Sequence, residues 1–115
     1  MRAQALAGGM PSEPLVLVRT TVASDAHAQG LAQALVEQGL AACVHAWPIQ
    51  SSYRWKGKTV HEREVLVEAR TTRGKELEVR RCMAKGHPYE LPLIESLPVE
   101  VNTDYARWAS EPAPT

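Results

Sequence analysis

The feature that most constrains the fold is a pair of long alternating segments in the middle of the chain. Residues 41–55 and 58–71 each alternate polar and apolar side chains, and only Lys56 and Gly57 lie between them. Such alternation is typical of half-buried β-strands, and a two-residue connection with glycine is typical of a tight hairpin. We therefore predict two antiparallel strands in one register. Pro48 cannot donate a backbone hydrogen bond, so it predicts an edge or a bulge in the first of them.

Four shorter periodic segments surround this hairpin. They are an apolar strand pattern at 15–22, helical patterns over 24–39 and 74–86, and a second strand pattern at 93–99. A short helix that begins at Asn102 or Thr103 follows. The resulting order, β-α-β-β-α-β with a terminal helix, predicts an α+β protein of the ferredoxin-like split βαβ class, in which two helices cover one face of an antiparallel sheet.

The length of the chain suits a single domain. Its 115 residues are 44% hydrophobic and 23% charged, which is typical of globular proteins that fold without a metal or a disulfide. We predict one domain over residues 15–109 and a flexible tail at 110–115. A loose leader is predicted at 1–14, in which Met10 is an alternative start.

Charge and hydropathy limit the classes of partner. The 13 basic and 13 acidic residues balance, so the chain lacks the positive charge that supplies most nucleic-acid affinity. No apolar run approaches the roughly 20 residues of a membrane span. Cys43 and Cys82 form no paired motif, which predicts free thiols in a reducing compartment. We therefore expect a cytoplasmic protein that binds neither nucleic acid nor membrane.

The hairpin is longer than its own helices can cover. Each arm of about 14 residues reaches roughly 45 Å, whereas a helix of about 15 residues spans only about 22 Å. The overhang carries Trp47, Tyr53 and Trp55, and exposed apolar strand edges are normally covered in folded proteins. We expect other copies of the chain to cover it in a closed symmetric ring.

Five ordered motifs resemble those of the CutA divalent-cation tolerance family. They are LAACV at 40–44, SYRWKGK at 52–58, EV at 64–65, HPYELP at 87–92 and the closing Asp104-Tyr105 with Trp108. The resemblance covers nearly the whole domain. It implies a homotrimer similar in architecture to the PII nitrogen-regulatory proteins, a role in tolerance to copper and other divalent ions, and no catalysis.

The resemblance also implies a copper site, of which this chain keeps one residue. Copper-binding members use a cysteine near the end of the first strand and two histidines before Pro-Tyr; the corresponding residues here are Arg19, Gly86 and His87. Cys43 and His45 are further metal candidates, because they share one strand face and offer sulfur and nitrogen to copper or another divalent cation. Their Cβ atoms are expected about 6.5 Å apart, which predicts that thiol and imidazole do not contact each other directly.

A cleft between subunits is the predicted ligand site. In the register set by the hairpin turn, Arg70 lies near Cys43, and prolines fix the direction of the segment at 87–92. The residues expected to line the cleft are Cys43, Trp55, Glu64, Arg70, Tyr89, Glu90 and Trp108. An arginine in such a cleft favours a small anion, so a PII-like signalling module that binds a small molecule or anion is the alternative function. A solvated face with an ion-pair network, including Glu62 and Glu68, is the structural alternative.

Overall fold

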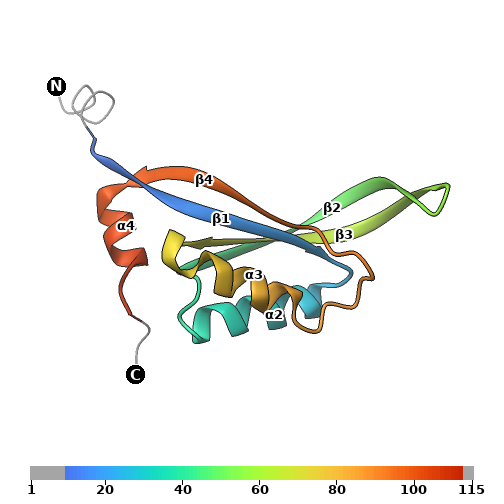
Figure 1. Ribbon diagram of the computed structural model, residues 1–115, viewed down its shortest axis with the longest axis horizontal. Helices are drawn as coiled ribbons and strands as arrows, with labels where there is room; N and C mark the ends of the chain where they lie inside the picture. Colours follow the sequence, from blue (N-terminus) through green and yellow to red (C-terminus); the bar gives the residue numbers. More distant parts are fainter. Residues whose placement is uncertain (1–9, 113–115) are drawn as a thin grey trace.

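The computed structural model of the protein describes residues 10–112 (Figure 1). Its elements are β1 (Ser12–Val22), α2 (Asp25–Glu37), β2 (Cys43–Trp55), β3 (Lys58–Thr71), the 3-10 turn η1 (Arg73–Lys75), α3 (Glu76–Ala84), β4 (Ile94–Asn102) and α4 (Thr103–Ala109). This α+β order of strands and helices is the predicted one. Within residues 10–112, no helix has the length and apolar character needed to cross a membrane.

The four strands form one antiparallel sheet in the order β2-β3-β1-β4. β3 and β1 occupy the centre, and β2 and β4 form the edges. Pro48 lies on β2 opposite Val65, and the register continues past it without a bulge. The edge position predicted for Pro48 is confirmed, because β2 is an edge strand of the sheet. One side of an edge strand has no partner, so a missing N–H on that side removes no ladder hydrogen bond.

The β2–β3 hairpin closes at the predicted turn. Trp55 pairs with Lys58, and Lys56 and Gly57 between them have φ angles of 49° and 79°, the left-handed conformation of a tight two-residue turn. The hairpin extends well past the ends of α2 and α3 (Figure 1). The predicted overhang is therefore present, in a molecule that measures 56 × 36 × 21 Å.

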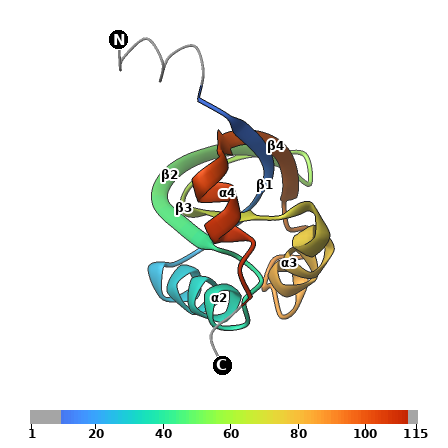
Figure 2. The same ribbon diagram turned by 90° about the vertical axis from the view of Figure 1, so that its left-hand side faces the viewer.

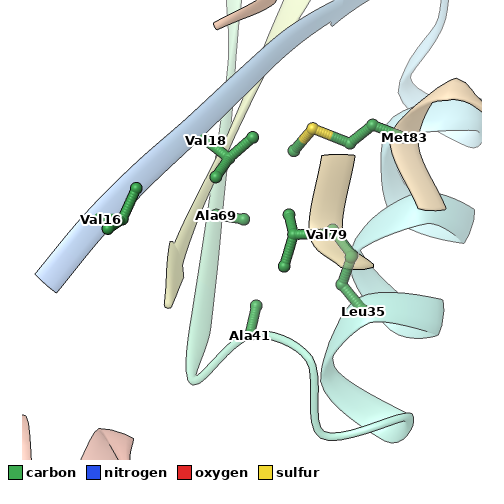
Figure 3. Packing of buried hydrophobic residues seen from close by; sticks show 7 residues of the cluster. All are labelled: Val16, Val18, Leu35, Ala41, Ala69, Val79 and Met83. Atoms are coloured by element: carbon green, nitrogen blue, oxygen red, sulfur yellow. The ribbon is translucent and has the colours of Figure 1, made fainter. Parts of the chain in front are cut away.

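Helices α2 and α3 lie side by side under one face of the sheet (Figure 2). The Ser24 side chain begins α2 by accepting a hydrogen bond from the His27 N–H at 3.1 Å. The main core cluster joins the sheet to both helices (Figure 3); its buried members are Val16, Val18, Leu35, Ala41, Ala69, Val79 and Met83. This core fixes which face of β2 and β3 remains free of helices.

Helix α4 packs against the opposite face of β1, at the start of that strand. Leu15 forms a small buried cluster there with Ala106 and Ala109. Because side chains alternate along a strand, Leu15 points away from the face that Val16 and Val18 bury. Between α4 and the hairpin tip, this second face carries both charged and large apolar side chains of β2 and β3, because Val65, Val67 and Ala69 of β3 point the other way, toward the helices.

Several element boundaries differ from prediction. β1 begins at Ser12, not near residue 15, and β4 ends at Asn102, not at 99, because residues 12–14 pair with residues 100–102. Residues 12–14 therefore belong to the fold and not to a loose leader. β2 begins at 43, two residues after the predicted start. The predictions for residues 1–9 and 113–115 lie outside the described residues.

Candidate functional site

The predicted cleft residues fall into two groups within one copy of the chain. The first lies toward the hairpin tip and includes Glu64, whereas the second lies near α4 and includes Cys43 and Arg70. Arg70 and Glu64 are six residues apart on β3, which is about 20 Å along an extended strand. A single cleft that unites the two groups stays a prediction about neighbouring copies of the chain.

The first group lines a groove of about 690 Å³ beside the hairpin. We call it the hairpin groove. Four of the predicted residues, Trp55, Glu64, Tyr89 and Glu90, are brought together there. The groove is also lined by Tyr53, Glu62, Leu91 and Leu93. It combines large apolar side chains with carboxylates.

Two tyrosine–glutamate pairs hold the groove. The Tyr89 hydroxyl donates to Glu64 Oε2 at 2.7 Å, and the Tyr53 hydroxyl donates to Glu62 Oε1 at 2.6 Å. Glu64 is only 7% exposed, so its carboxylate needs this donor. Burial, together with the bond to Glu64, raises the pKa of Tyr89 above its ordinary range. The bond to Glu62 raises the pKa of Tyr53 to about 12. Both phenols therefore remain donors at neutral pH.

His87 orients the segment that carries Tyr89. Its Nδ1 accepts the Tyr89 N–H at 3.2 Å, and its Nε2 lies 3.1 Å from the Thr21 carbonyl oxygen. A carbonyl only accepts, so Nε2 carries the ring proton and Nδ1 supplies the lone pair. Both ring nitrogens thus have protein partners. This geometry favours a positioning role over the metal-ligand role implied for His87.

Arg19 is part of an ion pair. Its Nε donates to Glu68 Oε2 at 2.8 Å, and its Nη1 lies 3.9 Å from Glu95 Oε2. Glu68 is buried, so the guanidinium supplies a charged partner that the carboxylate requires. At the strand position where the resemblance implies a copper-binding cysteine, this chain therefore has an arginine held by ion pairs.

The second group surrounds Cys43, which pairs with Arg70 across β2 and β3 as predicted. Cys43 Sγ lies 3.4 Å from His45 Nε2, and His45 Nδ1 lies 3.5 Å from Arg70 Nη1. The prediction that this thiol and imidazole do not contact each other is wrong. Side chains lean along a strand, so two that lean toward each other meet at their tips although their Cβ atoms are far apart.

Tyr105 of α4 completes this second group, and it was not among the predicted residues. Burial raises the pKa of Tyr105, the charge of Cys43 and a hydrogen bond to its sulfur raise it further, and the Arg70 guanidinium lowers it. Trp108 lies edge-on to the Tyr105 ring at 5.3 Å between centroids and is half exposed. We call Cys43, His45, Arg70 and Tyr105 the thiol cluster.

The metal-binding capacity of one copy is limited. Within residues 10–112, no group of three or more His, Cys, Asp or Glu side chains is arranged to hold an ion. Cys43 and His45 offer two donors. A tetrahedral ion with bonds of about 2.3 Å to sulfur and about 2.05 Å to nitrogen separates those donors by about 3.5 Å. The observed 3.4 Å matches that separation.

Comparisons with known proteins agree on one family. The family described as CutA1 divalent ion tolerance protein matches residues 16–112. The divalent-cation tolerance protein CutA of Thermotoga maritima is 39% identical over 98 residues, which are 84% of this chain and 97% of that protein.

Solved structures give the same result. The structure of CutA from Synechococcus elongatus PCC7942 has a TM-score of 0.79 at 39% identity and covers 85% of this chain and 91% of its own. The periplasmic divalent cation tolerance protein CutA from Archaeoglobus fulgidus has a TM-score of 0.79 at 31% identity, with 84% of this chain and 95% of its own covered.

Proposed function

Because the chain belongs to the CutA1 divalent ion tolerance family, we propose that it acts in tolerance to divalent cations as a ferredoxin-like homotrimer that binds a cation and catalyses no reaction. The observation that carries this proposal is the family match over residues 16–112, which includes every strand except the start of β1. The curated relatives are named for cation tolerance, and their names include no reaction.

The overhanging hairpin supports assembly. Large apolar side chains remain exposed on and beside it, and they are Trp47, Tyr53, Leu91 and Leu93. A cluster of this kind on one protein surface marks an interaction site. The outer edge of β2 has no partner strand among residues 10–112 and can pair with a strand of another copy. Three copies in a closed ring cover both features at once.

We assign the cation to Cys43 and His45. Their sulfur and nitrogen lie at the separation that one ion requires, and a thiolate with an imidazole suits copper and zinc. His87 is less suited, because both of its ring nitrogens already have partners. Two donors bind weakly by themselves, so water or a neighbouring copy supplies the remaining ligands.

Calorimetric titration of the metal-free protein with copper and zinc tests the cation site. The expected result is saturable binding that is lost in Cys43→Ser and retained in Cys82→Ser. Cys82 is the matched control because it is the other half-buried free thiol. Absence of binding at about millimolar concentration would remove the cation from the proposal, and binding that survives Cys43→Ser would remove this site.

The PII-like alternative has a separate measurement. A small anion or nucleotide that binds the folded protein raises its melting temperature. A rise with such ligands, and none with copper or zinc, would replace cation binding by small-molecule binding.

We place the protein in the cytoplasm, because Cys43 and Cys82 are both free thiols and reducing compartments maintain them. The Archaeoglobus relative is named as periplasmic. Cell fractionation followed by immunodetection separates the two compartments, and recovery of the protein only with periplasmic markers would contradict the assignment.

A further inference from the structure

The hairpin groove contains a buried carboxylate that is not paired with a cation. Glu64 is 7% exposed, and its Oε2 accepts the Tyr89 hydroxyl. Among residues 10–112, the ion pairs include the other buried glutamate, Glu68, which is held by Arg19, but none of them includes Glu64. A buried carboxylate is unfavourable without a positive partner. The groove therefore suits a cationic group that arrives from outside the chain.

The second oxygen of Glu64 opens into the groove. The bond from Tyr89 goes to Oε2, and Oε1 has no hydrogen-bond partner within the described part of the chain. In those same residues no side-chain oxygen is both fully buried and unpaired, so Oε1 must be reachable from outside. Because Glu64 lines the groove, a donor placed in the groove can bind this oxygen.

The other groups that line the groove favour a cation over an anion. The carboxylates of Glu62, Glu64 and Glu90 face a single guanidinium, that of Arg54. Both tyrosine hydroxyls in the groove already donate to glutamates. What remains for a ligand is mainly carboxylate oxygens and aromatic ring faces, and both of these attract positive charge.

An ammonium group of the chain itself already uses these two kinds of contact beside the groove. Lys56 Nζ lies 5.6 Å from the centroid of the Trp55 ring and 3.7 Å from Glu90 Oε2. Trp55 and Glu90 are groove residues. Lys56 thus shows how an ammonium group fits between a ring and a carboxylate here, and Tyr89 with Glu64 offers the same combination with no cation of its own.

The spacing of two carboxylates indicates the length of the ligand. Glu62 and Glu64 are two residues apart on β3 and share one face, so their backbone positions lie about 6.8 Å apart. An extended four-carbon chain with an amine at each end has a similar length. Ile49, which pairs with Glu64 across the two strands, and Leu66 also line the groove. Their apolar side chains can contact the methylene groups of such a chain.

We propose that the hairpin groove binds a linear aliphatic diamine. One ammonium group binds Glu64 beside the ring of Tyr89, and the other binds Glu62 beside Tyr53. Binding forms no covalent bond and needs no metal ion. It is independent of the cation assigned to Cys43 and His45, so the failure of one site leaves the other standing.

Calorimetric titration of the full, metal-free chain with 1,4-diaminobutane at constant ionic strength tests the site. Saturable binding is expected, at least about tenfold tighter than that of butylamine, because butylamine has only one ammonium group. Absence of saturable binding, as when a side chain of another copy fills the groove, would overturn the proposal. Equal affinities for the two amines would equally overturn it, since they would show that the two carboxylates do not act together.

Two variants locate the bound diamine. Glu64→Gln keeps an acceptor for the tyrosine hydroxyl but removes the charge, and it is expected to weaken binding at least about tenfold. Glu62→Gln changes an exposed residue and is expected to weaken binding several-fold, which keeps the test available if the buried position tolerates no change.

Two further variants are the controls. Glu78→Gln removes an exposed carboxylate on α3, and Cys43→Ser removes the thiol of the assigned cation site. Both are expected to leave the affinity for 1,4-diaminobutane unchanged, and circular dichroism reports that each variant is folded. Unchanged affinity in both Glu64→Gln and Glu62→Gln would refute the site, whatever the copper and zinc titrations show.

Discussion

Tyr89 is the side chain on which the hairpin groove most depends. It is the hydroxyl donor to Glu64, whose carboxylate is buried. Tyr89→Phe leaves that carboxylate short of a hydrogen bond and is expected to lower the free energy of unfolding by about 1–3 kcal/mol. Urea denaturation at fixed protein concentration measures the change. Tyr53→Phe is the control, because the pair of Tyr53 with Glu62 is exposed and its loss should change stability little. Equal losses in the two variants would contradict this account.

The tyrosines also predict the alkaline behaviour of the protein. All three have a raised pKa, with Tyr53 at about 12. In the unfolded chain they ionise near pH 10, so the folded chain holds these protons to higher pH. Their contribution to stability is therefore complete below about pH 10 and is lost as the pH rises through the folded-state values. Ultraviolet absorbance of phenolate should stay low at pH 10 while the protein is folded, and rise at higher pH or on unfolding. A full phenolate signal at pH 10 from folded protein would contradict the hydrogen bonding described for Tyr53 and Tyr89.

The local sequence pattern predicts the contacts of the site that lie within the hairpin, but not those that join segments distant in the chain. The pairing of Cys43 with Arg70 follows from the hairpin turn, because a two-residue loop sets the register of both strands. The bond between Tyr89 and Glu64 joins a loop to a strand, and the approach of Tyr105 to Cys43 joins a helix to a strand. Alternation says which face a residue occupies. It does not say which distant segment folds over that face.

At the scale of elements, two glycines predict opposite effects of the same substitution. Gly57 has a φ of 79° in the hairpin turn, and Gly30 lies inside α2; a Cβ at either position meets nothing within 4 Å. Gly57→Ala should therefore cost about 1 kcal/mol through backbone strain, whereas Gly30→Ala should stabilise the helix by about as much. Thermal denaturation of the two variants measures both. Effects of the same sign would show that packing, and not backbone conformation, determines the outcome.

The lengths of the strands show the same limit, because the local sequence pattern does not reveal pairing between distant segments. The hairpin arms could be predicted because their alternation continues up to a turn between neighbouring residues. The ends of β1 and β4 could not, because residues 12–14 are strand only through their pairing with residues 100–102. Neither segment has a strong strand pattern by itself. Each is ordered by a partner from the other end of the chain.

For the whole molecule, the positions of exposed leucines predict which surface lies at the interface between copies. Leu91, beside the overhang, is 74% exposed, and Leu77, on α3, is 57% exposed. A charge at either position costs little in a single copy, but at an interface a buried unpaired charge is strongly unfavourable. Sedimentation equilibrium should give three times the 12.6 kDa chain mass for the wild type and for Leu77→Glu, and a smaller mass for Leu91→Glu. A well-folded wild-type monomer at micromolar concentration would exclude the trimer.

Pro48 affects how copies of the chain can pair through the β2 edge without growing into a fibril. A long unpaired edge strand such as β2 is a template on which fibrils can grow. The two residues before Pro48, Ala46 and Trp47, are exposed. A proline in the middle of that strand interrupts the row of N–H groups that a stacking copy needs. A closed ring of a few copies tolerates the backbone N–H that Pro48 lacks, whereas an amyloid fibril would lose the same hydrogen bond in every layer.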